Sequence, residues 1–413
     1  MKNLYNDSRF RLIISANIAS SIGSGITMIA IPWMLVSSDN GNKVFGYITI
    51  CMTILSFILT PFVGNLVDKV SRKKLLIISE SICFALLFIF SLIGFVGVSY
   101  EIWHYTIIYM IGSLYYTIFY PTMFALNQEI FTKEHYKSLN GTMEVQGQIS
   151  SMIAGALASI LLLKWDLHYI LLLNTISYGA AIYFYLKLPY VRLPSMKQTE
   201  TVIKSRASDG LRYMLARPSV FIFLLFSFMP FIGVMLTNYL FPVYLVDVFK
   251  ADASVYGIEG MIYAIGAIIA GILVPTVSSK FGNEKTIIFG VFVYTIAISL
   301  IVFVNLPVYL SLMLFLAIGN SSTRVARNSF LMDHIPNDII GRVDSLFRTL
   351  GLLIRILLLA LFTEMVSSDL IVYCFIVLSG VLLASLCLVV ISWKKGFKVK
   401  EKDCHVIPKT SQI

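Results

Sequence analysis

The stretch Gly64–Lys74 reads Gly-Asn-Leu-Val-Asp-Lys-Val-Ser-Arg-Lys-Lys and joins two apolar runs, Val44–Val63 and Leu75–Val98. Each run is long enough to cross a bilayer, which takes roughly 20 apolar residues. Asp68 stands where the first helix is expected to end, and Arg72 stands where the second is expected to begin. Basic residues beside apolar spans mark the cytoplasmic side. The stretch therefore predicts a tight cytoplasmic turn between two membrane-spanning helices.

The composition of the whole chain agrees with a membrane protein. Of the 413 residues, 58% are hydrophobic and 13% are charged, and the mean hydropathy is +0.83. A soluble protein carries about 25% charged residues, so lipid must be the solvent for much of this chain. The net charge of +10 follows membrane topology and does not predict nucleic-acid binding. The cysteines and histidines show no disulfide framework or metal-ligand spacing, so neither a metal nor another cofactor is expected.

The hydropathy pattern predicts an all-α integral membrane protein with twelve transmembrane helices. The expected spans are Leu12–Val36, Val44–Val67, Leu75–Val98, Trp103–Phe131, Leu139–Leu163, Leu167–Leu188, Val220–Val248, Val255–Val277, Thr286–Val304, Pro307–Met332, Ile340–Val366 and Leu370–Trp393. They form an N-terminal six-helix bundle within residues 1–188 and a C-terminal bundle within residues 219–393. A polar cytoplasmic linker, 189–218, joins the bundles, and a basic tail, 394–413, follows them.

The distribution of basic residues predicts the orientation. If both termini are inside, the cytoplasmic segments hold 25 Lys and Arg, and the outer loops hold three, namely Lys43, Lys164 and Lys250. Such a bias sets topology. We expect a multi-pass protein of the bacterial plasma membrane, with both termini cytoplasmic, that contacts the lipid bilayer and is a monomer.

The first stretch has an internal repeat. Pro275–Lys285 aligns with Gly64–Lys74 at an offset of 211 residues, with Ser279 in place of Asp68 and Asn283 in place of Arg72. A topogenic basic loop would explain a single copy. A second, degenerate copy after the eighth span instead favours two related halves of six helices.

The spacing G-x-x-x-D-x-x-x-R-K-K, the twelve spans and the central linker together resemble the major facilitator superfamily along nearly the whole chain. The resemblance implies the major facilitator fold and secondary transport by alternating access. Three segments look like the macrolide-efflux subgroup, which also includes siderophore exporters: Gly23–Trp33, Asn238–Pro242 and Gly341–Val343. The chain departs from drug–proton antiporters at Gly112, where their fourth span carries an arginine, and in the fifth span, where Gly147, Ser151 and Gly155 occur without proline.

Ionisable side chains inside spans are costly in lipid and are functional candidates. Arg324 and Arg327 share one face of the tenth span, and Arg348 and Arg355 share one face of the eleventh. Pairing with Asp333, Asp344 or lipid phosphate is the structural alternative for all but Arg355. Guanidinium groups bind carboxylates through paired hydrogen bonds, so we expect these arginines to bind an anionic or zwitterionic cargo.

Polar side chains that are candidates for lining the substrate cavity occur on several other spans. For each of them, a hydrogen bond between helices is the alternative explanation. They are Asn17, Tyr116, Asn238, Tyr239 and Asn320.

The acidic residues near the inner membrane surface are candidates for proton coupling and for gating. Glu129 closes the fourth span and Glu144 opens the fifth, and either is a candidate proton carrier. The carboxylate of Glu80 is expected to pair with Lys73 or Lys74.

The superfamily resemblance implies a cytoplasmic gate. It is formed by Gly64, Asp68, Arg72 and Lys73, together with Glu129. In this gate Arg72 pairs with Glu129, Asp68 is held by the positive end of the eleventh span, and these contacts break when the inner side opens.

Together these features predict a secondary efflux transporter that is not an enzyme. It would export a small organic molecule, with protons as the coupling ion and a siderophore or metallophore as the favoured cargo. A macrolide or multidrug efflux pump is the alternative. An importer or a lipid flippase is further from the pattern. The sequence contains no nucleotide-binding P-loop and no catalytic motif.

Overall fold

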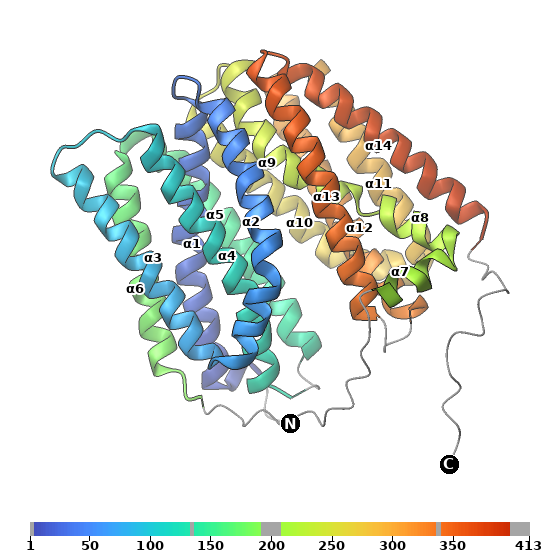
Figure 1. Ribbon diagram of the computed structural model, residues 1–413, viewed down its shortest axis with the longest axis horizontal. Coiled ribbons are helices and arrows are strands. Elements are labelled where there is room, and N and C mark those ends of the chain that lie inside the picture. Colours follow the sequence, from blue (N-terminus) through green and yellow to red (C-terminus); the bar gives the residue numbers. More distant parts are fainter. Residues whose placement is uncertain (1–3, 133–135, 191–207, 336–339, 397–413) are drawn as a thin grey trace.

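The computed structural model describes residues 4–132, 136–190, 208–335 and 340–396, and every regular element in these ranges is a helix (Figure 1). The first six long helices are α1 (Ser8–Val36), α2 (Gly41–Lys69), α3 (Arg72–Phe95), α4 (Ile102–Ile130), α5 (Tyr136–Lys164) and α6 (Leu167–Lys187). The remaining helices are α7 (Ser208–Leu215), α8 (Pro218–Phe226), α9 (Met229–Asp247), α10 (Ala253–Phe281), α11 (Asn283–Leu300), α12 (Leu306–His334), α13 (Ile340–Ser367) and α14 (Ile371–Lys394).

Twelve segments of the described chain are long and apolar enough to span a membrane, which confirms the predicted spans. Two differences from the prediction matter. The linker predicted at 189–218 contains the short helix α7, and the span predicted as one helix over Val220–Val248 is divided into α8 and α9.

The break between α8 and α9 falls at Ser227 and Phe228. Pro230 lies in the first turn of α9, where its missing N–H costs nothing. The amide of Phe228 donates to the carbonyl of Leu225, so the Leu224 carbonyl is available to side chains. It accepts from Ser227 Oγ at 3.0 Å and from Arg327 Nε at 3.4 Å. The break thus creates an acceptor inside the C-terminal helices.

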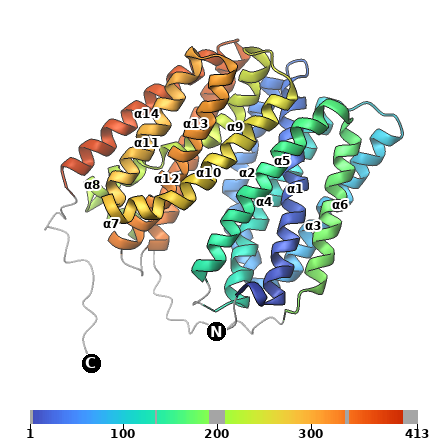
Figure 2. The ribbon, with the colours of Figure 1, turned by 180° about the vertical axis from the view of Figure 1, so that it is seen from behind.

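The helices form two groups, α1–α6 and α7–α14, that lean against each other (Figures 1 and 2). We call the end that holds the turn between α1 and α2 the apex, and the end that holds the turn between α2 and α3 the base. In Figure 1 the groups meet towards the apex, at the top, and diverge towards the base. The two groups are joined chiefly by α5 against α10 and by α2 against α13.

Close packing holds the two groups together on the apex side. A Cβ on Gly155 of α5 would lie 2.7 Å from the Gly257 carbonyl oxygen of α10, so these backbones touch because neither residue has a side chain. Trp33 stacks on Tyr256 with 6.1 Å between ring centroids. Nearer the base, a Cβ on Gly64 of α2 would meet no described atom within 4 Å apart from its own stretch of helix. Among the described residues, Gly64 therefore makes no close helix contact comparable to that of Gly155.

Candidate functional site

A cavity of about 280 Å³ opens among α8, α9, α12 and α13 in the C-terminal group. Guanidinium, amide and hydroxyl groups line it together with two aromatic rings. The lining residues are Ser227, Phe228, Phe231, Asn320, Thr323, Arg324, Arg327, Asn328, Asp344 and Arg348. The cavity thus collects four of the residues that the sequence singled out: Arg324, Arg327, Arg348 and Asn320.

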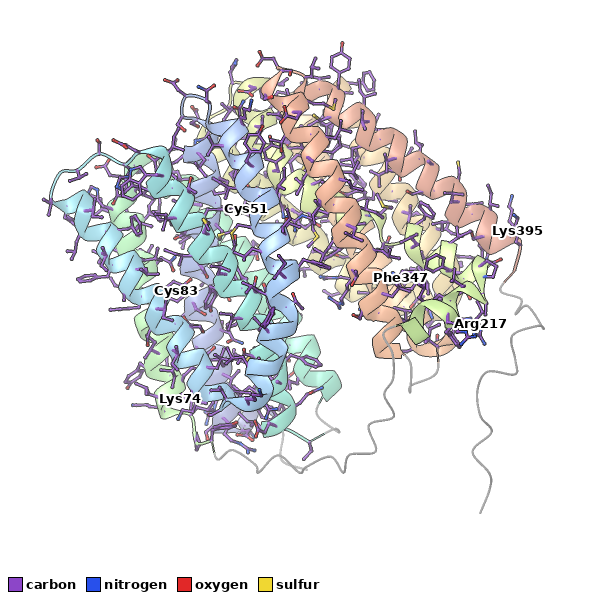
Figure 3. The ribbon with its side chains drawn as sticks, viewed as in Figure 1. Cys51, Lys74, Cys83, Arg217, Phe347 and Lys395 are labelled. Atoms are coloured by element: carbon purple, nitrogen blue, oxygen red, sulfur yellow. The ribbon has the colours of Figure 1, made fainter. Side chains whose placement is uncertain are left out.

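Arg327 is the most deeply placed of the three arginines, with 4% of its surface exposed. Its guanidinium carbon lies 4.7 Å from the ring centroid of Phe228 and 5.2 Å from that of Phe347. Figure 3 marks Phe347 on α13, close to α7 and α8. Nε points at the Leu224 carbonyl freed by the helix break, while the buried Nη2 has no hydrogen-bond partner among the described residues. The rings therefore hold a cation in place without neutralising it.

The other cavity residues differ in how far they are already engaged. Arg348 donates to Asp344, four residues earlier on α13, at 2.7 Å, and its side chain is largely exposed. Arg324 follows Asn320 by one helical turn on α12, so both face the cavity. Asn320 donates to Tyr263 Oη at 2.9 Å, and its buried Oδ1 has no described partner. The cavity therefore combines an excess of positive charge with an unused acceptor.

Arg355 lies outside this cavity, although it is on the same helix as Arg348. Its Nη1 contacts Met235 Sδ at 3.9 Å, and its buried Nε has no described hydrogen-bond partner. Arg355 forms no salt bridge with any residue whose side chain the structure describes. Fifteen residues separate it from the start of α13 at Ile340, or roughly 22 Å along a helix.

The remaining cavity candidates of the sequence lie elsewhere. Tyr239 is buried at the apex, where its hydroxyl donates to the Asn42 carbonyl at 3.3 Å. Asn17 accepts from Tyr185 at 2.8 Å inside the N-terminal group. Tyr116 donates to Ser24 at 3.2 Å, and Asn238 is exposed on α9.

At the base of the N-terminal group, Arg72 of α3 and Glu129 of α4 form an ion pair at 2.6 Å. The Tyr190 hydroxyl donates to the same Glu129 oxygen at 2.6 Å. Burial and the bond to Glu129 raise the pKa of Tyr190 above its ordinary value, so this phenol remains a donor at neutral pH. Lys73 donates to the carbonyls that end α6, those of Leu186 and Leu188, at 3.0 and 2.8 Å. These contacts tie α3, α4 and α6 into one unit.

The position of this ion pair corrects the expected gate. Arg72 and Glu129 both belong to the N-terminal group, so their bond does not bridge the two groups, and it is intact while the groups diverge at the base. The internal repeat has a matching contact, in which Asn283 of α11 donates to Asp333 of α12 at 2.9 Å. Both contacts brace neighbouring helices within a group. Opening the base does not require the Arg72–Glu129 pair to break.

Two predicted residues, Asp68 and Glu144, have side chains that lie outside those the structure describes. The predicted pairing of Glu80 with a lysine is wrong. Glu80 is fully buried and accepts from the hydroxyl of Tyr115 at 2.8 Å. The sequence analysis did not single out Glu259 on α10, which accepts from the Tyr309 hydroxyl at 2.7 Å and is buried. A lone carboxylate in the apolar run Val255–Val277 was the signal for it.

Two groups of spanning helices that meet at one end, with a charged cavity open between helices of one group, define a membrane transport protein. The cavity can bind a polar solute, and no group of three or more His, Cys, Asp or Glu that could hold a metal occurs among the described residues. The chain belongs to the Major Facilitator Superfamily, whose model matches residues 13–359. It is accordingly a transporter and not an enzyme.

Known relatives agree with this assignment. The chain is 21% identical over 370 residues to macrolide efflux protein A of Streptococcus pyogenes, covering 86% of this chain and 89% of the relative. It is 20% identical over 351 residues to the staphyloferrin A transporter of Staphylococcus aureus, covering 81% and 84%. The crystal structure of the nucleoside transporter NupG matches the fold with a TM-score of 0.72 at 13% identity, over 94% of this chain and 99% of that one.

Proposed function

We propose that this transporter exports an anionic or zwitterionic small molecule from the bacterial cytoplasm, driven by proton entry. The observation that supports the proposal most strongly is the cavity lined by Arg324, Arg327 and Arg348, with Asp344 as the one carboxylate among the lining residues that the structure describes. A siderophore or metallophore rich in carboxylates is the favoured cargo.

The orientation follows from the basic residues. The bias of 25 Lys and Arg to three in the sequence supports an orientation with the base on the cytoplasmic side of a bacterial plasma membrane. Both termini are then cytoplasmic. Because the two groups diverge at the base (Figure 1), the arrangement faces inward, which is the state in which an exporter takes up its cargo.

The charge of the cavity favours an anion. Arg348 and Asp344 offset each other, whereas the guanidinium group of Arg327 keeps a buried donor for a cargo. Arg327 Nη2 is buried and has no described partner, and an unsatisfied cationic donor of this kind gains most from a carboxylate oxygen. A lipophilic cation would meet the like charge of Arg327 at this place.

The size of the cavity suggests how cargo is held. A volume of about 280 Å³ is at the lower end of the range for small-molecule sites. It suits one carboxylate-bearing arm of a cargo, while the remainder of the cargo lies outside the cavity. Arg355 is roughly 10 Å further along α13 than Arg348, given seven residues at 1.5 Å each. It would meet the cargo as the base closes.

Glu129 and Glu144 remain the proposed proton carriers near the base. Glu129 is engaged by Arg72 and Tyr190, and a neighbouring guanidinium favours the charged form of a carboxylate. Glutamine at either position would lose gradient-driven export and retain cargo binding if that residue carries the proton.

A macrolide or multidrug efflux pump is the second candidate function. The relative named macrolide efflux protein A, at 21% identity, favours it. The relative named staphyloferrin A transporter, at 20% identity, leaves the cargo class open. An importer and a lipid flippase have no specific observation in their favour.

Uptake into everted membrane vesicles under an imposed proton gradient tests the proposal. The probes are rhizoferrin, a polycarboxylate siderophore, together with erythromycin and rhodamine 6G. We expect gradient-dependent uptake of rhizoferrin that fails in Arg324→Ala and persists in Arg212→Ala, a control at an exposed position on α7. Uptake of erythromycin or rhodamine 6G without rhizoferrin uptake would reject the anionic cargo and favour the second candidate.

A further inference from the structure

Glu80 is a carboxylate buried in the middle of the N-terminal group, where the proposed cargo site does not use it. None of its surface is exposed. Oε1 accepts from the Tyr115 hydroxyl at 2.8 Å, and Oε2 has no hydrogen-bond partner among the described residues. An isolated ionised carboxylate is expensive to bury, and such a group takes up a proton instead.

The groups around Glu80 offer it no cation. Lys73, on the same helix, is turned to the carbonyls at the end of α6. The side chain of Glu80 takes part in no salt bridge with a described residue. Figure 3 labels Cys83, one turn further along α3. The titratable groups facing Glu80 from α3, α4 and α6 are one thiol and four phenols: Cys83, Tyr115, Tyr116, Tyr178 and Tyr185.

The internal repeat indicates that the fold does not need this carboxylate. Helices α3 and α11 begin at Arg72 and Asn283, 211 residues apart, so the repeat partner of Glu80 is Val291, which is also fully buried. The partner of Tyr115 by the starts of α4 and α12 is Gly319, which packs on the backbone of Gly290. The C-terminal group packs its core without polar side chains at these two positions, whereas the N-terminal group has a carboxylate there.

Hydroxyl groups lead from Glu80 towards Tyr116 on α4. Tyr115 Oη lies 3.4 Å from Ser20 Oγ on α1, and Ser24, one turn further along α1, accepts from Tyr116 at 3.2 Å. Only the step between the two serines, which spans one helical turn, lacks a direct side-chain bond. A single water can bridge such a step.

Tyr116 faces the C-terminal group. It follows Tyr109 by seven residues and so lies on the same face of α4, and Tyr109 packs on Phe45 near the apex with 5.4 Å between ring centroids. Phe45 in turn contacts Tyr239 of the C-terminal group. Tyr120, one turn closer to the base, is exposed and stacks on Tyr116 at 5.4 Å.

We infer that Glu80 is a proton-binding site of the transporter, which exchanges its proton with water between the two groups through the hydroxyls of Tyr115, Ser20, Ser24 and Tyr116. The proton leaves Glu80 as the carboxylic acid becomes a carboxylate, and it is accepted by water at the mouth of this path. The inference deepens the proposed function, because it adds a proton-binding site away from the base to the two carboxylates proposed there as proton carriers. It does not depend on which cargo is carried.

Infrared difference spectroscopy of the purified, cargo-free transporter in lipid tests this inference. The wild type should show the C=O stretching band of a protonated, buried carboxylic acid that disappears reversibly as the bulk pH is raised. The band should be missing in Glu80→Gln and retained in Glu129→Gln. Glu259→Gln identifies the contribution of the other buried acid.

Two further variants keep the test decisive if Glu80→Gln fails to fold. Tyr115→Phe should move the band to higher frequency, because the carbonyl oxygen loses its hydrogen-bond donor. Tyr116→Phe should slow the loss of the band after a pH jump several-fold. A spectrum with no pH-dependent carboxyl band that responds to Glu80→Gln or Tyr115→Phe would overturn the inference, while anion export could still stand. If the wild type shows the Glu80 band but does not export the anion, only the proposed class of cargo is rejected.

Discussion

Replacing Arg327 by methionine should weaken cargo binding without lowering the stability of the protein. Methionine is unbranched and adaptable, so it can fill the space between Phe228 and Phe347. The Leu224 carbonyl would keep the bond from Ser227 Oγ at 3.0 Å, so no buried acceptor is left without a partner. The substitution therefore removes the charge with little loss of packing.

The expected changes in Tm and in cargo affinity follow from the contacts of the Arg327 guanidinium group. Its two ring contacts, at 4.7 and 5.2 Å, are worth about 0.5–2 kcal/mol each. Two costs oppose these gains in the wild type: the unsatisfied Nη2, at about 1–3 kcal/mol, and the desolvation of a buried cation. These terms offset one another, so we expect an apparent Tm within about 3 °C of the wild type, or higher. Loss of a charged hydrogen bond to cargo, about 1.5–3 kcal/mol, corresponds to about a tenfold to hundredfold weaker Kd.

The assay pairs thermal unfolding in detergent with rhizoferrin uptake into everted vesicles. Arg212→Met, which removes a charge from an exposed position on α7, should change neither quantity. A clear fall in Tm with normal rhizoferrin uptake would mean that Arg327 serves the scaffold, and it would refute the reasoning.

Three other substitutions test the fold and the base contacts. Gly155→Val should push α5 from α10, because its Cβ would lie 2.7 Å from the Gly257 carbonyl oxygen, and labelling of an introduced apex cysteine should rise; unchanged labelling would contradict the role of this contact in holding the apex closed. Arg72→Ala should destabilise the protein by about 1–3 kcal/mol, the cost of leaving the partly buried Glu129 without its charged donor, and adding Glu129→Gln should restore part of the Tm because no uncompensated charge remains. If the double variant recovers none of the Tm lost in Arg72→Ala, Arg72 acts by packing alone. Asp68→Asn should reach the membrane at normal levels but lose transport. Transport by this variant at the wild-type rate would contradict the gating role given to Asp68.

The features that the sequence predicted well are local ones. Twelve apolar runs of spanning length and the positions of their charged turns follow from the identity of neighbouring residues. The repeat of Gly64–Lys74 in Pro275–Lys285 gave the two-fold organisation of the helices. The pairing of Arg72 with Glu129 was expected from the superfamily resemblance, and the bond is present at 2.6 Å. Its position within one group was not foreseen, because nothing in the sequence states which helices move together.

The details of the site depend on packing between distant segments. Arg327 lies between Phe228 and Phe347, and neither ring is within a helical turn of it in the sequence. Pro230 was the one local signal of the break that frees the Leu224 carbonyl. Arg355 shares a helix face with Arg348 by periodicity, yet depth along the helix places only Arg348 at the cavity. Periodicity predicts the face of a helix and not which neighbour covers it.

The most direct test of the central claim is a simultaneous measurement of cargo and protons in sealed everted vesicles with an acidic interior. We predict that adding rhizoferrin outside will cause its accumulation and, at the same moment, an alkaline shift inside, both absent in Arg324→Ala. Accumulation of rhizoferrin with no change in interior pH, or no accumulation at all, would contradict proton-coupled export of an anion.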